Sequence, residues 1–115
     1  MYMDNKTILL AANDRIAKGD NEGFLAFCSE DVVWEFIGDQ ILEGKSAVRE
    51  YMKATYQHPP MFDLQQLIGE GDYVTAIGKI TLTDTQEALL TYSYCDVWRF
   101  REGEMVALQA FVIEL

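Results

Sequence analysis

The sequence has few of the residues that build zinc sites and disulfides. Its 115 residues include two cysteines and one histidine, and neither Cys28 nor Cys95 belongs to a Cys-x-x-Cys motif. A structural zinc site takes about four cysteine or histidine ligands, so no metal site is expected. Half of the residues are hydrophobic, which allows a core without such staples. Two distant cysteines indicate free thiols in a reducing cytoplasm.

Basic residues are also scarce. Nine lysines and arginines stand against 19 aspartates and glutamates, which gives a net charge of −10. Nucleic acids and anionic membranes are polyanions, so this balance argues against both as partners. No apolar run approaches the roughly 20 residues of a membrane span, and the N-terminus lacks the apolar region of a signal peptide. We therefore expect a cytoplasmic protein in which residues 1–115 form one domain.

Hydrophobic periodicity predicts helices first and strands later. Helical spacing, bounded by Gly19 and by Pro59-Pro60, predicts helices over about 5–18, 21–28 and 45–56. Alternating apolar and β-branched residues predict strands over about 32–37, 62–70, 73–82, 88–101 and 105–114. The short turns between the later strands predict antiparallel hairpins. This pattern is typical of an α+β fold, with the helices packed on one face of a curved antiparallel sheet.

One strand carries an unusual set of side chains. Strand alternation between Leu90 and Phe100 puts four large aromatics and one acid on the same face: Tyr92, Tyr94, Asp96, Trp98 and Phe100. Aspartate is disfavoured inside strands, and its charge is costly beside an apolar wall. If Asp96 faces a cavity, desolvation raises its pKa, and it can donate a hydrogen bond or act as a base. The alternative is a structural aspartate bonded to a neighbouring group.

The order and spacing of several short segments carry a family resemblance. They are Gly19-Asp20, the run 30–36, Gly44-Lys45, Asp96-Val-Trp-Arg-Phe100, Gly103 and Leu108-Gln-Ala-Phe111. Over nearly its whole length the chain resembles the NTF2-like superfamily, in the branch of ketosteroid isomerase and the SnoaL-like polyketide cyclases. The resemblance implies a cone-shaped fold, with three N-terminal helices packed on a curved antiparallel sheet that encloses a pocket. This fold hosts many reactions and also non-enzymes, so it implies no single activity.

The resemblance carries over one of three isomerase residues. Ketosteroid isomerases use a tyrosine on the first helix, an aspartate base at the end of the first strand and a protonated aspartate in the long strand. The long-strand aspartate falls on Asp96, the tyrosine on Ala12 and the base on Phe36. A shift of one residue would put Glu35 at the base position. The missing base and tyrosine argue against ordinary ketosteroid isomerisation.

The predicted site follows from these positions. Asp96 is the catalytic candidate, with Tyr94 as its polar partner on the same face. The ligand-binding candidates are the side chains expected around the cavity: Tyr92, Trp98, Trp34, Phe36, Tyr51, Met52, Ala12 and Leu108. Each of these could instead be ordinary core. Glu114 could reach the rim, whereas His58, the alternative proton carrier, is expected in an exposed turn.

The residues leave three functions open. The first is an isomerase, cyclase or dehydratase that uses Asp96 on a small hydrophobic molecule, with no cofactor implied. The second is a non-catalytic ligand-binding protein, and the third is a protein-interaction module. The opposite sheet face carries an apolar patch that includes Val97, Phe111 and Ile113. In this superfamily that face commonly forms a dimer interface, so the resemblance predicts a homodimer.

Overall fold

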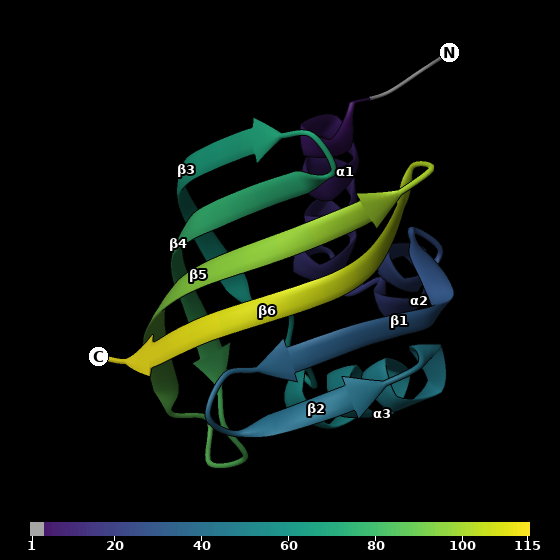
Figure 1. Ribbon diagram of the computed structural model, residues 1–115. Coiled ribbons are helices and arrows are strands. Elements are labelled where there is room, and N and C mark those ends of the chain that lie inside the picture. Colours follow the sequence, from purple (N-terminus) through teal and green to yellow (C-terminus); the bar gives the residue numbers. More distant parts are fainter. Residues whose placement is uncertain (1–3) are drawn as a thin grey trace.

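The chain folds into three helices and one six-stranded sheet. The computed structural model describes residues 4–115. Its elements are α1 (Asn5–Ala17), α2 (Asn21–Leu25), β1 (Cys28–Phe36), β2 (Gln40–Glu43), α3 (Lys45–Thr55), β3 (Met61–Glu70), β4 (Tyr73–Thr83), β5 (Leu89–Arg101) and β6 (Glu104–Glu114). The strand order is β2-β1-β6-β5-β4-β3, and the helices cover one side of the curved sheet (Figure 1). The predicted α+β architecture, with the helices packed on one face of a curved sheet, is therefore confirmed.

Three features of the sheet differ from the prediction. The strand predicted over 32–37 begins at Cys28, so the helix predicted as far as residue 28 is wrong, and α2 ends at Leu25. β2 was not predicted at all. β1 also runs parallel to β6, with Trp34 opposite Leu108, although every other strand pair is antiparallel. The pairing with a strand more than 70 residues away overrides the local helical signal of Phe27 and Cys28.

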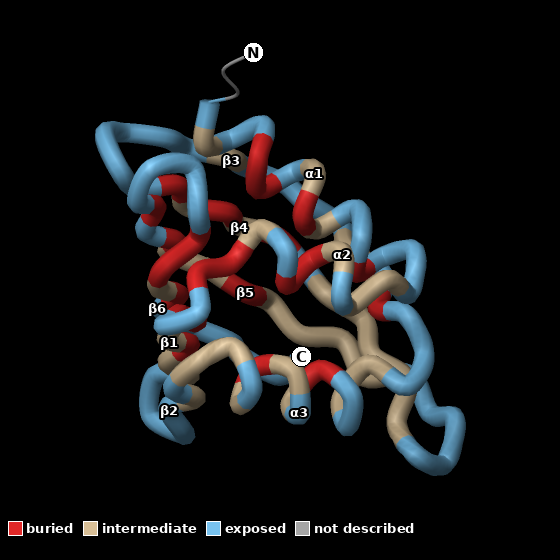
Figure 2. Tube along the Cα trace, turned by 90° about the vertical axis from the view of Figure 1, so that its right-hand side faces the viewer, coloured by how far each residue is buried: buried red, intermediate tan, exposed pale blue. Residues whose placement is uncertain are grey.

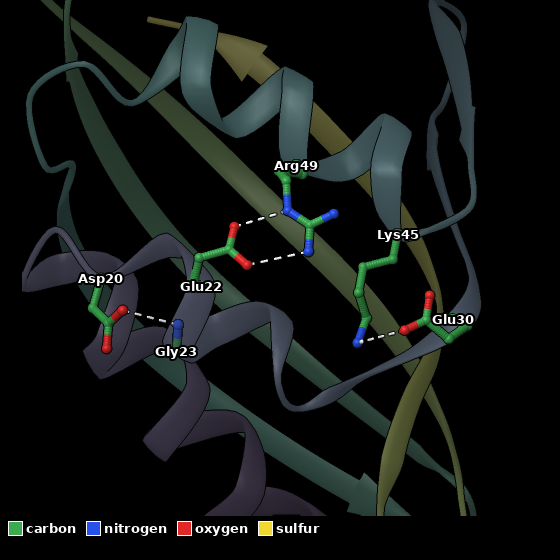
Figure 3. Close-up of polar contacts among 6 residues, drawn as sticks. All are labelled: Asp20, Glu22, Gly23, Glu30, Lys45 and Arg49. Atoms are coloured by element: carbon green, nitrogen blue, oxygen red, sulfur yellow. Dashed lines mark hydrogen bonds and ion pairs between the residues drawn. The ribbon is translucent and has the colours of Figure 1, made fainter.

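Side-chain caps and ion pairs fix the short helices. The Gly23 N–H donates to the Asp20 carboxylate at 2.9 Å, which caps α2. Arg49 on α3 donates two hydrogen bonds to Glu22 on α2, at 2.8 and 3.1 Å, and Lys45 lies 3.6 Å from Glu30 on β1 (Figure 3). Exposed pairs of this kind contribute about 1 kcal/mol or less each. They orient α3, whereas the packing behind them supplies most of the stability.

The core lies between the helices and the concave face of the sheet. α1 turns Ile8, Leu9, Ala12 and Ile16 inward, as its spacing predicted, and α3 buries Val48 and Met52. Figure 2 shows α1 and α2 on one side of the interior and α3 on the other. Most of β5 between them is only partly buried.

No helix within residues 4–115 is long and apolar enough to cross a membrane.

Candidate functional site

A cavity of about 450 Å³ opens on the concave face of the sheet. This volume lies within the range of small-molecule sites, roughly 300–1,000 Å³. Every element except β2 contributes to its wall. The lining residues are Asn13, Ile16, Phe24, Trp34, Phe36, Ile37, Asp39, Tyr51, Thr55, Tyr56, Phe62, Ile80, Leu82, Tyr92, Tyr94, Asp96, Trp98, Leu108, Ala110, Val112 and Glu114.

The structure brings most of the predicted site residues to this cavity. Eight of them lie on its wall: Asp96, Tyr94, Tyr92, Trp98, Trp34, Phe36, Tyr51 and Leu108. Ala12 and Met52 are not among the lining residues, and both are fully buried, at 0% exposure. Successive helical residues point about 100° apart, so Met52 turns into the core while its neighbour Tyr51 faces the cavity. Ala12 and Met52 thus lie behind the wall.

Asp96 sits in the middle of β5, flanked by two small side chains. In the ladder it lies opposite Ala76 of β4 and Ala110 of β6. Residues that face each other across a ladder point to the same side of the sheet, so the carboxyl group stands between two methyl groups. No hydrogen bond or ion pair to this carboxyl group is found among the polar contacts of residues 4–115. Its oxygens are therefore available to a ligand in the cavity.

The surroundings of Asp96 change its acidity. The small exposed part of Asp96 faces the cavity, and protein atoms surround the rest of its carboxyl group. This burial raises the pKa of Asp96 from 3.8 to about 7, because the charged form loses its hydration. Both the acid and the carboxylate are then populated near neutral pH. Such a group can both donate and accept a proton in the physiological range.

Three tyrosines share the cavity wall with this acid. Burial, and after it the charge of Asp96, raises the pKa of Tyr94 to about 12. Burial is also the main cause that raises the pKa values of Tyr51 and Tyr56, and the Asp96 charge adds to both. The three phenols therefore remain protonated and can donate hydrogen bonds at neutral pH. The site combines one acid that titrates near pH 7 with several fixed donors.

Aromatic rings form the wall that runs from α2 to α3. The Trp34 ring centroid lies 5.7 Å from Phe24, 5.9 Å from Trp98 and 6.1 Å from Tyr51, all edge to face. Tyr51 continues the wall to Phe36 at 5.0 Å and to Tyr56 at 6.2 Å. The indole N–H groups of Trp34 and Trp98 are buried and have no hydrogen-bond partner within the described chain. Because each ring holds its neighbours, the wall is a preformed surface for an apolar ligand.

Several polar lining residues escaped the sequence analysis. Asp39 follows Gly38, whose φ is +81°, in the turn after β1, and it lines the cavity. Asn13 and Asp39 follow the carried-over positions Ala12 and Phe36 by one and three residues. Polar side chains therefore exist near both places where the isomerase residues are missing. A search a few residues either side of those positions would have found them.

Other residues of the chain are far less suited to chemistry in the cavity. His58 is exposed and is not among the lining residues, as the sequence predicted. Glu35 faces the outer side of the sheet, beside Arg99 and Gln109. No cluster of three or more His, Cys, Asp or Glu side chains placed to hold a metal ion occurs within residues 4–115.

Sequence comparison decides the family. The profile of the SnoaL-like domain matches residues 9–108, most of the chain. The chain belongs to the SnoaL-like domain family. Among curated proteins, no sequence gives a significant match.

Solved structures share the fold of this SnoaL-like chain at low sequence identity. The epoxide hydrolase/cyclase-like enzyme SalBIII, of pyran ring formation in salinomycin, superposes with a TM-score of 0.87 and 20% identity, over 94% of this chain and 89% of its own. An LEH-like epoxide hydrolase of M. tuberculosis superposes with a TM-score of 0.84 and 13% sequence identity, over 94% of this chain and 81% of its own. The Δ5-3-ketosteroid isomerase of Mycobacterium sp. superposes with a TM-score of 0.82 and 14% sequence identity, over 95% of this chain and 96% of its own. At these identities the likeness shows the fold, and the differing activities show that the fold alone does not define a reaction.

Proposed function

We propose that this SnoaL-like chain binds a small, mainly apolar molecule in the cavity and transfers a proton to and from it through Asp96. The observation that carries the proposal is a carboxyl group with a pKa of about 7, without a hydrogen-bond partner among residues 4–115, on the wall of a ligand-sized cavity. Buried acids with shifted pKa values concentrate at functional sites. The reaction class is isomerisation, cyclisation or dehydration.

The side chains divide the chemical work. Ionised Asp96 accepts a proton from a carbon next to a ligand carbonyl, and the electron pair of that C–H bond moves toward the carbonyl oxygen. The Tyr94 hydroxyl, two residues away on the same face, donates a hydrogen bond to the developing charge. Protonated Asp96 then returns the proton to another carbon, or to a leaving hydroxyl group. The aromatic wall at Trp34, Phe36 and Tyr51 holds the apolar body of the ligand and excludes water.

A second candidate function is binding without catalysis. One observation favours it: the positions of the isomerase tyrosine and base hold Ala12 and Phe36. In that case Asp96 orients the ligand and takes no proton from it. The open cavity supports both of these functions over an interaction module, for which a filled interior would suffice.

Hydrogen exchange distinguishes catalysis from binding. The protein is incubated in D₂O with a panel of cyclic enones, 1,3-diketones and β-hydroxy ketones, and deuterium incorporation next to the carbonyl is followed by mass spectrometry. We expect Asp96→Asn to slow any catalysed exchange on the order of 10²–10⁴-fold, the usual contribution of a general acid–base group. Asp63→Asn is the matched control, because Asp63 is exposed on β3 and does not line the cavity. Exchange that survives Asp96→Asn would rule out the catalytic role.

We also propose that the chain forms a homodimer through the outer sheet face. Phe111 is 44% exposed and Ile113 68%, and Val97 and Cys95 point to the same side of the sheet. An apolar patch of this kind marks an interaction surface more often than a solvated one. Glu35 and Arg99 lie beside it, so two copies related by a two-fold axis could pair opposite charges across it.

Charge substitution tests the dimer. We expect Phe111→Asp to convert a dimer into a monomer at micromolar concentration, because it puts a carboxylate into the centre of the patch. Sedimentation velocity measures the change. Leu10→Asp is the control: Leu10 is 47% exposed but lies on α1, away from the sheet face, and should leave association unchanged. A wild-type protein that sediments as a monomer at this concentration contradicts the proposal.

A further inference from the structure

The charged groups of the cavity are all acids. Asp39, Asp96 and Glu114 line it, and among the described lining residues there is no lysine, arginine or histidine. We propose that the natural ligand is an organic amine, whose protonated nitrogen lies against Asp96 and whose apolar body lies against the aromatic wall. This inference rests on the second candidate function, binding at the same site, because a carboxylate paired with the ammonium group of the ligand does not also take a proton from a carbon atom.

Asp96 supplies the first argument. Its ionised form lacks a hydrogen-bond or ion-pair partner among residues 4–115, and the ladder leaves only alanine methyl groups on either side. An uncharged ligand would leave that charge unpaired in the wall, which is costly. A protonated amine supplies both the opposite charge and N–H donors. A carboxylate or phosphate ligand would instead face a like charge.

The aromatic wall supplies the second argument. Tyr51 packs against Phe36 and Tyr56, with ring centroids at 5.0 and 6.2 Å, and the charges of Asp39 and Asp96 both act on its hydroxyl. The rings therefore adjoin the carboxylates. Faces of Trp, Tyr and Phe attract cations, and this attraction adds to that of a carboxylate. Rings next to an unpaired acid form a surface that suits an ammonium group with an apolar substituent.

The mouth of the cavity supplies the third argument. Asp39 lies in the turn after β1, and Glu114 lies at the end of β6, opposite Tyr92 of β5. Both side chains are exposed, so they meet an entering ligand before Asp96 does. Carboxylates at the entrance of a cleft raise the local concentration of cations and repel anions. The net charge of −10 acts in the same direction.

Three isosteric probes test the inference: 1-naphthylmethylamine, 1-naphthalenemethanol and 1-naphthoate. They are titrated at pH 8 by calorimetry, which needs no knowledge of the natural ligand. We expect the amine to bind on the order of tenfold or more tightly than the alcohol, and the carboxylate to bind weakest. Asp96→Asn should weaken the amine on the order of 10–100-fold, as for a charge pair that loses one member, and leave the alcohol within about threefold. Retained binding of the alcohol shows that the variant is folded.

The pH dependence has a definite sign. The amine needs ionised Asp96, so below pH 7 its affinity should fall about tenfold per pH unit and its binding should release a proton. A neutral ligand that accepts a hydrogen bond from protonated Asp96 would show the opposite trend. The other titratable groups that face the cavity are Tyr51, Tyr56, Tyr92, Tyr94, Asp39 and Glu114. In the double variant Asp39→Asn, Glu114→Gln, the affinity of the amine should still fall below pH 7. That result would assign the pH dependence to Asp96.

The outcomes separate this inference from the function on which it rests. If the alcohol binds as tightly as the amine, or the affinity of the amine does not fall below pH 7, the ligand is not a cation, but the cavity still binds small molecules. If none of the three probes binds the wild-type protein, both proposals fail.

Discussion

Replacing Asp96 with asparagine is expected to stabilise the folded protein at pH 8 and to have little effect at pH 4. Burial raises the pKa of Asp96 from its ordinary value of 3.8 to about 7 in the folded state. Between these values the folded chain keeps a proton that the unfolded chain has released, so stability falls as the pH rises from about 4 to 7. At roughly 1.4 kcal/mol per pKa unit, the cost above pH 7 is on the order of 2–4 kcal/mol, reduced by any water that enters the cavity. Asparagine has nearly the same shape and carries no charge, so it removes this cost.

Urea unfolding between pH 4 and 8 measures the effect as a difference between wild type and Asp96→Asn. The subtraction removes the contribution of the 18 other acids, which both proteins share. Asp63→Asn, at an exposed position on β3, should show no such pH-dependent gain. If Asp96→Asn is destabilising at pH 8, the ionised carboxylate has a partner in the folded protein, and the account of its raised pKa is wrong.

A gain in stability at pH 8 would also bear on function. A buried acid without a partner lowers the stability of the fold, and a neutral side chain of the same size would fit the position. Proteins commonly keep such unfavourable groups where activity needs them. Stabilisation by Asp96→Asn together with loss of proton transfer would therefore support a functional role that a merely structural aspartate does not have.

The part of the site on β5 could be predicted because strand geometry is local. Alternation puts Tyr92, Tyr94, Asp96 and Trp98 on one face whatever the partners of the strand, and all four line the cavity. The same parity argument places Trp34 and Phe36 together on β1. Once helices cover that face of the sheet, these side chains must surround the space between.

The rest of the site depends on contacts between distant segments. Asp39 reaches the cavity because the chain turns at Gly38 after β1, and Tyr56 because α3 ends just before it. The spacing of residues alone does not show that Asp39 and Tyr56 point into the cavity. The first residue of β1 is also set by a distant contact, because Cys28 lies opposite Met105 of β6, a partner that no local pattern indicates. Predictions from periodicity fail where pairing across the fold competes with local preference.

Phe24→Ala is expected to be the most destabilising substitution in the aromatic wall. Phe24 is fully buried, and its ring lies 5.7 Å from Trp34 and 6.2 Å from Trp98. Truncation of a buried phenylalanine costs about 3–5 kcal/mol, from lost transfer energy and the cavity that remains. The α2 helix has only five residues, too few to be stable alone, so its position depends on this ring. Since Phe24 also lines the ligand cavity, the new space would join the existing one.

Guanidinium unfolding, followed by tryptophan fluorescence, measures the free energy of unfolding that Phe24→Ala loses. The signal is suitable because Trp34 and Trp98 both lie against the deleted ring. Domains are stable by about 5–15 kcal/mol, so the variant could be largely unfolded, and Phe24→Leu provides a milder second measurement with an expected loss of about 1–2 kcal/mol.

Phe111→Ala is the matched control, since this ring lies 44% exposed on the outer face. Its effect should depend on protein concentration if the outer face joins two subunits, whereas that of Phe24→Ala arises within one chain. A loss below about 1 kcal/mol for Phe24→Ala would mean that α2 and the aromatic wall are held by contacts other than this ring.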